Sequence, residues 1–434
     1  MRYAANLLVV SDSPDNAIEP PLRAAGYHCV RLSFRDMISH DFGSGKFDLI
    51  LIDGDHNEYE VELKKLAELA DFHNISMMII GVDDVRCRVQ TIAAGHGELE
   101  LRSRVNALVR IETMHQELHR RVETLKAYGA DFSDVEVPPL DIGDANILIV
   151  GSQTLMLGNI LLRLDARAKL HICKDAEYAL SDLREGEFDA VILSGFGLGD
   201  RHLRLCNDIR SDTRLYNLPV LMVLNEGDSR EAAYIHGVSD VVLHEREMGS
   251  LLNRIGLQIR QHRYRYAMQI LFRRARSHPV ADGPTDLYSP AFLQAHLPLI
   301  LREHDLQGKS LTVARLRILN IDEIAKDGGF PLRDHLLRQI GSMIGFLVRA
   351  EDFCASYDVG EFVLTLPGTR PEDARSALGR IRAVIGSTDF AGPEGQFNIR
   401  AEVAFDLVEP EIGDGITRLL ARKFIANGGA EQAA

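Results

Sequence analysis

Short apolar runs alternate with helix-length segments through residues 1–265 of the chain. Each run holds three to five residues and ends at polar turn residues. The runs are Leu7–Val10, Leu49–Ile52, Met77–Ile80, Ile147–Val150, Ala190–Leu193, Val220–Leu224 and Val241–Leu243. Strand-length runs separated by helical segments are typical of parallel strands with crossover helices. The pattern therefore predicts an α/β fold for this part of the chain.

One phrase of this pattern occurs twice. Residues Phe47–Asp53 (FDLILID) and Phe188–Ser194 (FDAVILS) have the same length and the same order of aromatic, acidic and apolar positions. Between them lies an acidic stretch without periodicity, Asp131–Asp144, which contains two adjacent prolines. We therefore predict a duplication at the scale of a domain, with one domain at residues 1–130 and the other at residues 144–265.

Two long helices are predicted, and the role of each leaves alternatives open. Leu99–Leu125 has apolar residues at three- and four-residue spacing. It is either the core-packed last helix of the first domain or a helix that pairs with a neighbour as a short coiled coil. Leu251–Ser277 is dense in arginine. A solvated helix between domains is favoured over nucleic-acid binding, because arginine stems cover apolar surface well.

The pattern changes after Pro279, Gly283 and Pro284, which end the arginine-dense helix. From there, helical segments and strand-like runs are mixed, and these runs are Leu311–Leu319, Phe353–Tyr357, Glu361–Leu366 and Ile399–Phe405. This mixture predicts a third domain of the α+β class at residues 285–434.

Length and charge narrow the class of protein further. The 434 residues exceed one ordinary domain of about 150 residues. A net charge of −14 argues against a nucleic-acid polymer or an anionic membrane as a partner. No apolar run is long enough for a membrane span, and the N-terminus lacks the apolar region of a secretory signal. The five cysteines include no CxxC pair, so we expect a cytoplasmic protein without a disulfide framework.

The order of elements in the first two domains, together with the repeated phrase, resembles the receiver domain of bacterial response regulators. The resemblance implies a doubly wound, five-stranded sheet with its site at the carboxyl ends of the strands. In that family, acidic residues hold Mg²⁺ beside a phosphorylated aspartate. Asp53 stands at the phosphoacceptor position of the first domain, and Asp12 supplies one acid of the pair. These two residues are the candidates for Mg²⁺ and for phosphorylation.

The rest of the family's phosphorylation set is missing. Gly81 stands at the hydroxyl position of the first domain, and the stretch Gly95–Arg104 contains no lysine and is too short for a full fifth strand. In the second domain Ser194 replaces the phosphoacceptor and His244 replaces the lysine. We expect the first domain to be an inert dimerisation module, with phosphorylation of Asp53 as the alternative, and the second to be an adaptor.

The third domain contains the segment Ser356–Phe362 (SYDVGEF) between two apolar runs, which predicts a hairpin. Together with the phrases Thr285–Ser289, Arg333–Arg338 and Leu364–Thr369, this segment resembles a degenerate GGDEF domain of the diguanylate cyclase family. The resemblance extends over most of residues 285–434 and rests on several phrases. It implies a cyclase-like α+β fold for the third domain.

The GGDEF motif itself is altered. Asp358 and Val359 take the two glycine positions, Gly360 takes the acidic position, and Glu361 and Phe362 are retained. The cyclase joins two GTP molecules with the help of two Mg²⁺ ions that clamp the phosphates. A side chain at 359 obstructs the close approach of backbone to phosphate, and a negative charge at 358 repels it.

The metal carboxylates of the family are also replaced. One belongs at the position of Arg317 and the other at the position of Gly360. Of the residues that hold guanine in the family, Asp334 remains, whereas Ala325 replaces an asparagine. We therefore expect no metal in this domain and no enzymatic activity.

An inhibitory RxxD site of the same family is retained as Arg349–Asp352, with its aspartate six residues before Asp358. The resemblance adds Arg380 on the following helix. The resemblance implies that these three residues bind cyclic di-GMP, which fits their chemistry, since a guanidinium can bind guanine or phosphate bidentately and a carboxylate can accept from guanine N–H groups. The alternative is that Arg349 and Asp352 form a surface ion pair of little energetic value.

Two receiver-like domains before a GGDEF domain is the arrangement of the PleD type of response regulator. The resemblance to its inactive members implies a homodimeric cyclic di-GMP effector or adaptor that acts at a cell pole. Its partners would be cell-cycle regulators and protease adaptor proteins, through which it would direct regulated proteolysis. Two alternatives are a nucleotide-independent dimeric scaffold and a residual diguanylate cyclase. GTP as an allosteric ligand in the former active site is disfavoured by Asp358 and Val359.

Overall fold

The computed structural model describes residues 3–13, 17–37, 47–53, 60–72, 75–81, 89–93, 95–129, 132, 135, 137–139, 141–152, 154–164, 167–195, 200–276, 278–393, 398–415 and 418–419. Two compact units are present. We call Ala5–Met114 with Val137–Tyr266 the N-terminal unit. Met1–Ala4, His115–Glu136 and Ala267–Ala434 form the C-terminal unit.

The N-terminal unit begins with a parallel sheet in the strand order β2-β1-β3-β4-β5. Its strands are β1 (Asn6–Ser11), β2 (His28–Leu32), β3 (Leu49–Asp53), β4 (Ser76–Ile80) and β5 (Gln90–Ile92). The helices along this part of the chain are α1 (Glu19–Ala24), α2 (Phe34–Met37), α3 (Glu60–Phe72) and α4 (Glu98–Ala127). This is the strand order of doubly wound, flavodoxin-like folds, which place their sites at the carboxyl edge of the sheet.

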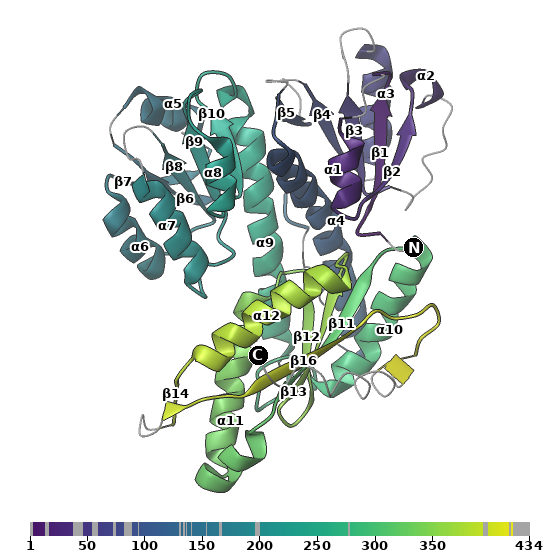
Figure 1. Cartoon of the computed structure of the whole chain (residues 1–434), viewed down its shortest axis with the longest axis vertical. Helices are drawn as coiled ribbons and strands as arrows, with labels where there is room; N and C mark the ends of the chain where they lie inside the picture. The colour runs from purple at the N-terminus through teal and green to yellow at the C-terminus, as the bar shows by residue number, and fades with distance from the viewer. Residues whose placement is uncertain are drawn as a thin grey trace. The chain divides into compact units, whose positions relative to one another are not determined.

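A second parallel sheet in the same unit repeats the order, as β7-β6-β8-β9-β10. Its strands are β6 (Asn146–Val150), β7 (Lys169–Cys173), β8 (Ala190–Ser194), β9 (Val220–Leu224) and β10 (Asp240–Leu243). The helices are α5 (Leu155–Leu164), α6 (Ala176–Glu185), α7 (Asp200–Ser211), α8 (Arg230–Ile235), the short 3₁₀ helix η1 (Met248–Ser250) and α9 (Leu251–Ala275) (Figure 1).

Alternation along the strands explains why the second sheet is covered on both faces. Ile147 and Ile149 of β6 pack in one cluster with α5 and α9, whereas Leu148 and Val150 pack in another with α6, α7 and α8. Successive side chains of a strand point to opposite faces, so a continuous apolar run buries both. The α/β class predicted from these runs is confirmed.

The C-terminal unit contains an antiparallel sheet in the order β12-β13-β11-β16. Its strands are β11 (Leu311–Ile318), β12 (Phe353–Asp358), β13 (Glu361–Pro367) and β16 (Val403–Val408). A separate two-stranded ribbon pairs β14 (Phe390–Ala391) with β15 (Asn398–Ile399). The helices are α10 (Pro290–Gln307), α11 (Ile321–Leu347) and α12 (Pro371–Ser387).

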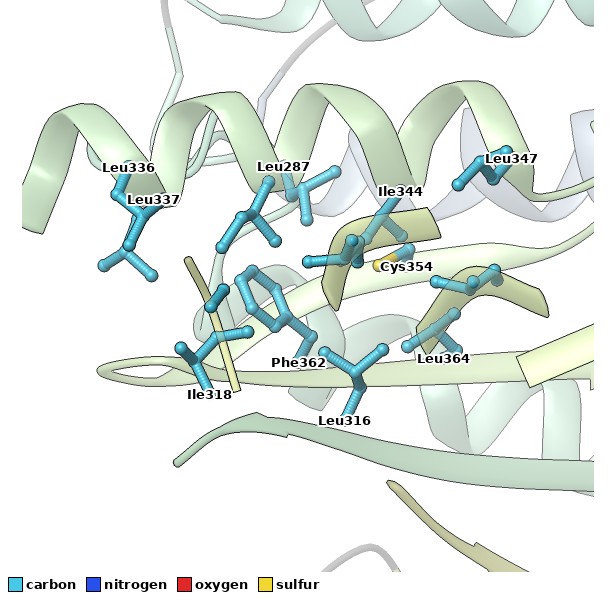
Figure 2. Close-up of a cluster of buried hydrophobic side chains, with 14 of the residues drawn as sticks. Leu287, Leu316, Ile318, Leu336, Leu337, Ile344, Leu347, Cys354, Phe362 and Leu364 are labelled. Atoms are coloured by element: carbon cyan, nitrogen blue, oxygen red, sulfur yellow. The ribbon is translucent and has the colours of Figure 1, made fainter. Parts of the chain in front are cut away.

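Helix α11 covers one face of this sheet. Its residues Leu336, Leu337 and Ile344 lie against Leu316 of β11 and Phe362 of β13 (Figure 2). Phe353 of β12 points to the other face of the sheet, because its neighbour Cys354 packs in the cluster with α11 and successive side chains alternate. Phe353 instead contacts Phe292 and His296 of α10, with ring centroids 5.9 and 4.7 Å away. The hairpin of β12 and β13 therefore packs against α11 on one face and α10 on the other.

Several expectations from the sequence are corrected. The run Ile399–Phe405 is two strands, because β15 pairs with β14 and β16 with β11. The first sheet has a fifth strand, Gln90–Ile92, which lies before the stretch Gly95–Arg104 that is too short to form one. The sequence pattern does not predict strands β2 and β7, because both lie at sheet edges and mix polar with apolar residues.

The two predicted long helices are present with small shifts at their ends, as α4 and α9. Leu108 and Leu118 of α4 are both buried, but Leu108 belongs to the N-terminal unit and Leu118 to the C-terminal unit, so the helix continues beyond the first domain. The expectation that α9 is a solvated helix is wrong for Arg254, which is 1% exposed and pairs with Asp240 and Glu247. Among the described residues, none of the helices is both long and apolar enough to span a bilayer.

Candidate functional site

The turn between β12 and β13 brings the altered motif beside the end of β11. The amide of Ile318 donates to the carbonyl of Gly360 over 2.8 Å, and Arg317 is the register partner of Glu361. Gly360 has φ +73°, and a Cβ there would lie 3.1 Å from the side chain of Ile321. Local geometry therefore favours glycine at the position where the cyclase family has an acidic residue.

Two arginines of β11 are paired with carboxylates on neighbouring strands. Arg317 donates from Nη2 to Asp406 Oδ2 of β16 over 2.9 Å. Arg315 donates to Glu361 of β13 from Nε over 3.0 Å and from Nη2 over 2.6 Å. Within the part of the chain that the structure describes, no group of three or more His, Cys, Asp or Glu side chains could hold a metal ion. The carboxylates of Glu361 and Asp406 are thus bound to guanidinium groups.

The other motif residues also make local contacts. The carboxylate of Asp358 accepts from the amide of Val359 over 2.7 Å, and half of the Val359 side chain is exposed. Asp334 accepts from Arg333, from Nε over 2.8 Å and from Nη2 over 2.7 Å. Ala325 lies on α11 and adds no polar group. Asp334 is the residue that the resemblance assigns to guanine and that this chain retains. Its carboxylate is therefore already bound to its sequence neighbour, Arg333.

The RxxD loop, residues 348–352, connects α11 to β12. Asp352 is 7% exposed, and its Oδ2 accepts from the backbone amide of Arg349 over 2.8 Å. Arg349 is exposed, and among the described residues its guanidinium makes no ion pair. The alternative of a surface ion pair between these two side chains is therefore wrong. The carboxylate shapes the loop from inside while the guanidinium faces solvent.

Arg380, the third predicted ligand residue, lies exposed on α12. The sequence prediction missed a residue on the inner side of the loop. Arg121 of α4 donates from Nη2 to the carbonyl of Asp352 over 2.9 Å and to that of Ala350 over 3.4 Å. A signal existed in the sequence, since Glu117 and Arg121 stand four residues apart beside the apolar stripe of this helix.

In the first sheet, Asp12 and Asp53 lie at the carboxyl ends of β1 and β3. Asp53 accepts from the hydroxyl of Ser11, its register partner, over 2.9 Å. The carboxylate of Asp12 accepts from the amide of Phe34 over 3.1 Å, at the start of α2. Both acids are at the edge where a phosphorylation site would lie, and Asp12 makes a capping contact there.

In the second sheet the corresponding positions hold no carboxylate. Ser194 is buried at the end of β8, where a Cβ on Gly151 would come within 2.7 Å of it. His244 follows β10, and its Nε2 lies 2.9 Å from Asn159 Nδ2. Gly151 and Ser194 are therefore closely packed at this edge of the sheet.

Comparison with known proteins identifies the C-terminal domain. Residues 280–422 match the family "Diguanylate cyclase, GGDEF domain". The chain is 23% identical over 351 residues to the response regulator PleD of Caulobacter vibrioides, a match that covers 79% of this chain and 76% of PleD. It is 31% identical over 115 residues to the diguanylate cyclase DgcP of Pseudomonas aeruginosa, covering 26% of this chain and 17% of DgcP.

Among solved structures, the GGDEF domain of DgcB from Caulobacter crescentus, in complex with c-di-GMP, is 20% identical. That similarity covers 32% of this chain and 83% of the DgcB domain, with a TM-score of 0.31. The family match gives the C-terminal domain its class: it is a GGDEF domain. Over most of its length the chain is, more particularly, similar to the response regulator PleD, and the GGDEF domain lies at its C-terminal end.

Proposed function

We propose that this protein is a non-catalytic effector that binds cyclic di-GMP through Arg349, Asp352 and Arg380. The observation that carries the proposal is the state of Arg349. Its guanidinium is exposed and makes no ion pair among the described residues, on a loop whose backbone is held by Asp352. A planar guanidinium in that state can bind a guanine edge or a phosphate bidentately without first breaking another contact.

The absence of catalysis is part of the same proposal. The family's chemistry implies two Mg²⁺ ions, and the residues present do not fit them. Position 317 is an arginine paired with Asp406, and position 360 has no side chain. Glu361, the retained acidic residue of the motif, is bound to Arg315. A cation at a metal-ligand position opposes metal binding by direct repulsion.

Before the GGDEF domain we propose two tandem receiver-like domains, at residues 1–130 and 144–265. The repeated strand order supports this assignment. The first domain would serve in dimerisation, and Asp12 with Asp53 would be its candidates for Mg²⁺ or phosphorylation. The second, with Ser194 and His244 at the key positions, would act as an adaptor.

The biological role that we propose follows the resemblance to PopA, a catalytically inactive paralogue of PleD. Ligand binding would be coupled to localisation at a cell pole and to regulated proteolysis, through cell-cycle regulators and protease adaptor proteins. A ligand can shift a protein between states only through different affinities for them, so a change in assembly or partner binding must accompany cyclic di-GMP.

Calorimetric titration of the full chain with cyclic di-GMP tests the proposal. We expect saturable binding that disappears in Arg349→Ala. Arg370→Ala is the matched control, since Arg370 begins a second RxxD sequence and is bound to Asp373 over 3.0 Å. GTP with Mg²⁺ should give neither binding nor turnover.

Other outcomes would favour the rivals. If the protein does not bind the dinucleotide at tens of micromolar, the result favours the nucleotide-independent dimeric scaffold. If it forms cyclic di-GMP from GTP, the result favours the residual cyclase.

A further inference from the structure

Helix α4 carries a buried carboxylate among three cationic or titratable groups. Glu117 is fully buried, and Arg121 donates to its Oε1 over 2.6 Å. Arg120 donates to its Oε2 over 3.1 Å, and Nε2 of His296 lies 3.1 Å from Oε1. Burial by itself would raise the pKa of Glu117, but these neighbours hold it below its usual range. The cluster therefore contains a buried charge whose partners satisfy it.

Arg121 has a second set of contacts that Arg120 lacks. While its Nε binds Glu117, its Nη2 binds the carbonyls of Ala350 and Asp352. Its guanidinium also lies over the ring of Tyr288, 5.5 Å from the centroid. Arg120 pairs with Glu117 and with Glu303 of α10. One arginine thus fixes the backbone of the RxxD loop, and its neighbour does not.

The loop is consequently held at two places. Inside it, Asp352 binds the amide of Arg349. Behind it, Arg121 binds the carbonyl of the same Asp352. Charge-assisted hydrogen bonds to backbone are strong, and burial strengthens them further. A ligand that must meet Arg349 in one geometry loses affinity when the loop samples others, because ordering the loop then opposes binding.

We propose that Arg121, oriented by Glu117, is the positioning residue of the cyclic di-GMP loop, so that ligand binding and the end of helix α4 stabilise one another. The inference rests on the proposed function. Coupling free energies are reciprocal, so a residue of α4 that improves binding requires that the ligand stabilise the same part of α4. The affected region of α4 is residues 115–127, which belong to the C-terminal unit.

Two buried arginines on the same helix give a matched pair of variants. Arg120 is 5% exposed and Arg121 is 6% exposed, and both bind Glu117. In the full chain, Arg121→Met should weaken cyclic di-GMP about tenfold or more, whereas Arg120→Met should change the affinity less than about threefold. Circular dichroism and thermal unfolding of both variants measure the loss of stability that they share.

Hydrogen–deuterium exchange supplies a readout that a general loss of stability would not produce. Without ligand, the amides of residues 349–353 should exchange faster in Arg121→Met than in Arg120→Met. With cyclic di-GMP, residues 115–127 should gain protection in the wild-type chain and in Arg120→Met, but not in Arg121→Met. If Arg121→Met does not fold, Arg121→Lys replaces it, because an ammonium keeps the charge beside Glu117 without bridging carboxylate and carbonyls together.

Equal affinities of the two variants, or equal loop exchange in both, would overturn the inference. A wild-type chain that binds no cyclic di-GMP would instead overturn the proposed function. In that case exchange in the ligand-free protein still decides whether Arg121 holds the loop.

Discussion

Two regions of the GGDEF domain, the end of β11 and the RxxD loop, use arginine in different ways. Arg315 and Arg317 each bind a carboxylate on a neighbouring strand, over 2.5 and 2.9 Å at the shortest contacts. Arg349 is exposed, and its guanidinium has no ion-pair partner among the described residues. A ligand at β11 would have to displace a bound carboxylate, whereas a ligand at Arg349 would not. Arginine therefore occupies the carboxylates at the end of β11, whereas at the RxxD loop its guanidinium is available to a ligand.

The aspartates of the two regions permit the strongest test of this difference. Asp352 accepts from the amide of Arg349, and Asp358 accepts from the amide of Val359, over 2.8 and 2.7 Å. We expect Asp352→Ala to weaken cyclic di-GMP on the order of 100-fold, or about 2.7 kcal/mol, because the loop loses its internal hydrogen bond. Calorimetry measures the change. Asp358→Ala is the control and should stay within about threefold of wild type; comparable losses in both would erase the distinction between the regions.

The N-terminal unit contains a contrasting case, the buried imidazole of His202. His202 of α7 is 2% exposed, neither ring nitrogen has a hydrogen-bond partner within the described part of the chain, and burial lowers its pKa to about 4. Between the usual pKa of about 6.5 and that value, the unfolded chain binds more protons than the folded one. His202 should therefore leave the free energy of unfolding unchanged above pH 6.5. It should lower that free energy by on the order of 3 kcal/mol as the pH drops to 4.

Urea unfolding at several pH values measures this loss. His202→Leu removes the titrating group, so its contribution to the slope should disappear. A pH dependence unchanged by that substitution would assign the acid sensitivity to other groups.

Backbone geometry at the turn between β12 and β13 gives a smaller effect. Gly360→Ala should destabilise the chain by about 1–2 kcal/mol, because φ is positive and the new Cβ meets Ile321 at 3.1 Å. Gly379 of α12 is the matched control, because a Cβ added there would have no neighbour within 4 Å. Gly379→Ala should be neutral or stabilise by up to about 1 kcal/mol, as alanine favours helix. Denaturant midpoints compare the two; the same sign for both would contradict strain at the turn.

The smallest effect concerns the ion pair of Arg315 and Glu361. Its side chains are 22% and 20% exposed, so solvent screens the pair. A double-mutant cycle with Arg315→Met and Glu361→Gln should give a coupling energy of about 1 kcal/mol or less. None of these variants should alter cyclic di-GMP affinity. A change in affinity would mean that the two regions are not independent.

Much of the architecture could be predicted from the sequence because buried parallel strands are continuous apolar runs. Residues such as Leu49–Ile52 and Val220–Leu224 lie in strands with nearly the predicted ends. Edge strand β2 and the three-residue β5 were missed, since pairing with a neighbour rather than their own pattern defines them. The split of Ile399–Phe405 was missed for the same reason, as each half pairs with a different strand.

The candidate site was predictable only where its residues are close in sequence. The register of Arg349 and Asp352 relative to the motif is a local property of the chain. Arg121 lies 231 residues before Asp352, and only folding brings its guanidinium to the loop. The burial of Arg254 was hidden in the same way, since its carboxylate partners come from β10 and the segment after it.

The exposed state of Arg349 also bears on how this chain can change over generations. Its guanidinium contributes no ion pair to the described part of the fold, so folding by itself does not select for arginine at position 349. Glu117 and Arg121 are in the opposite position, because each is a buried charge that binds the other, and losing either removes an ion pair from the interior. If relatives that have lost the catalytic residues still keep arginine at position 349, selection for a ligand, and not for stability, is recorded there.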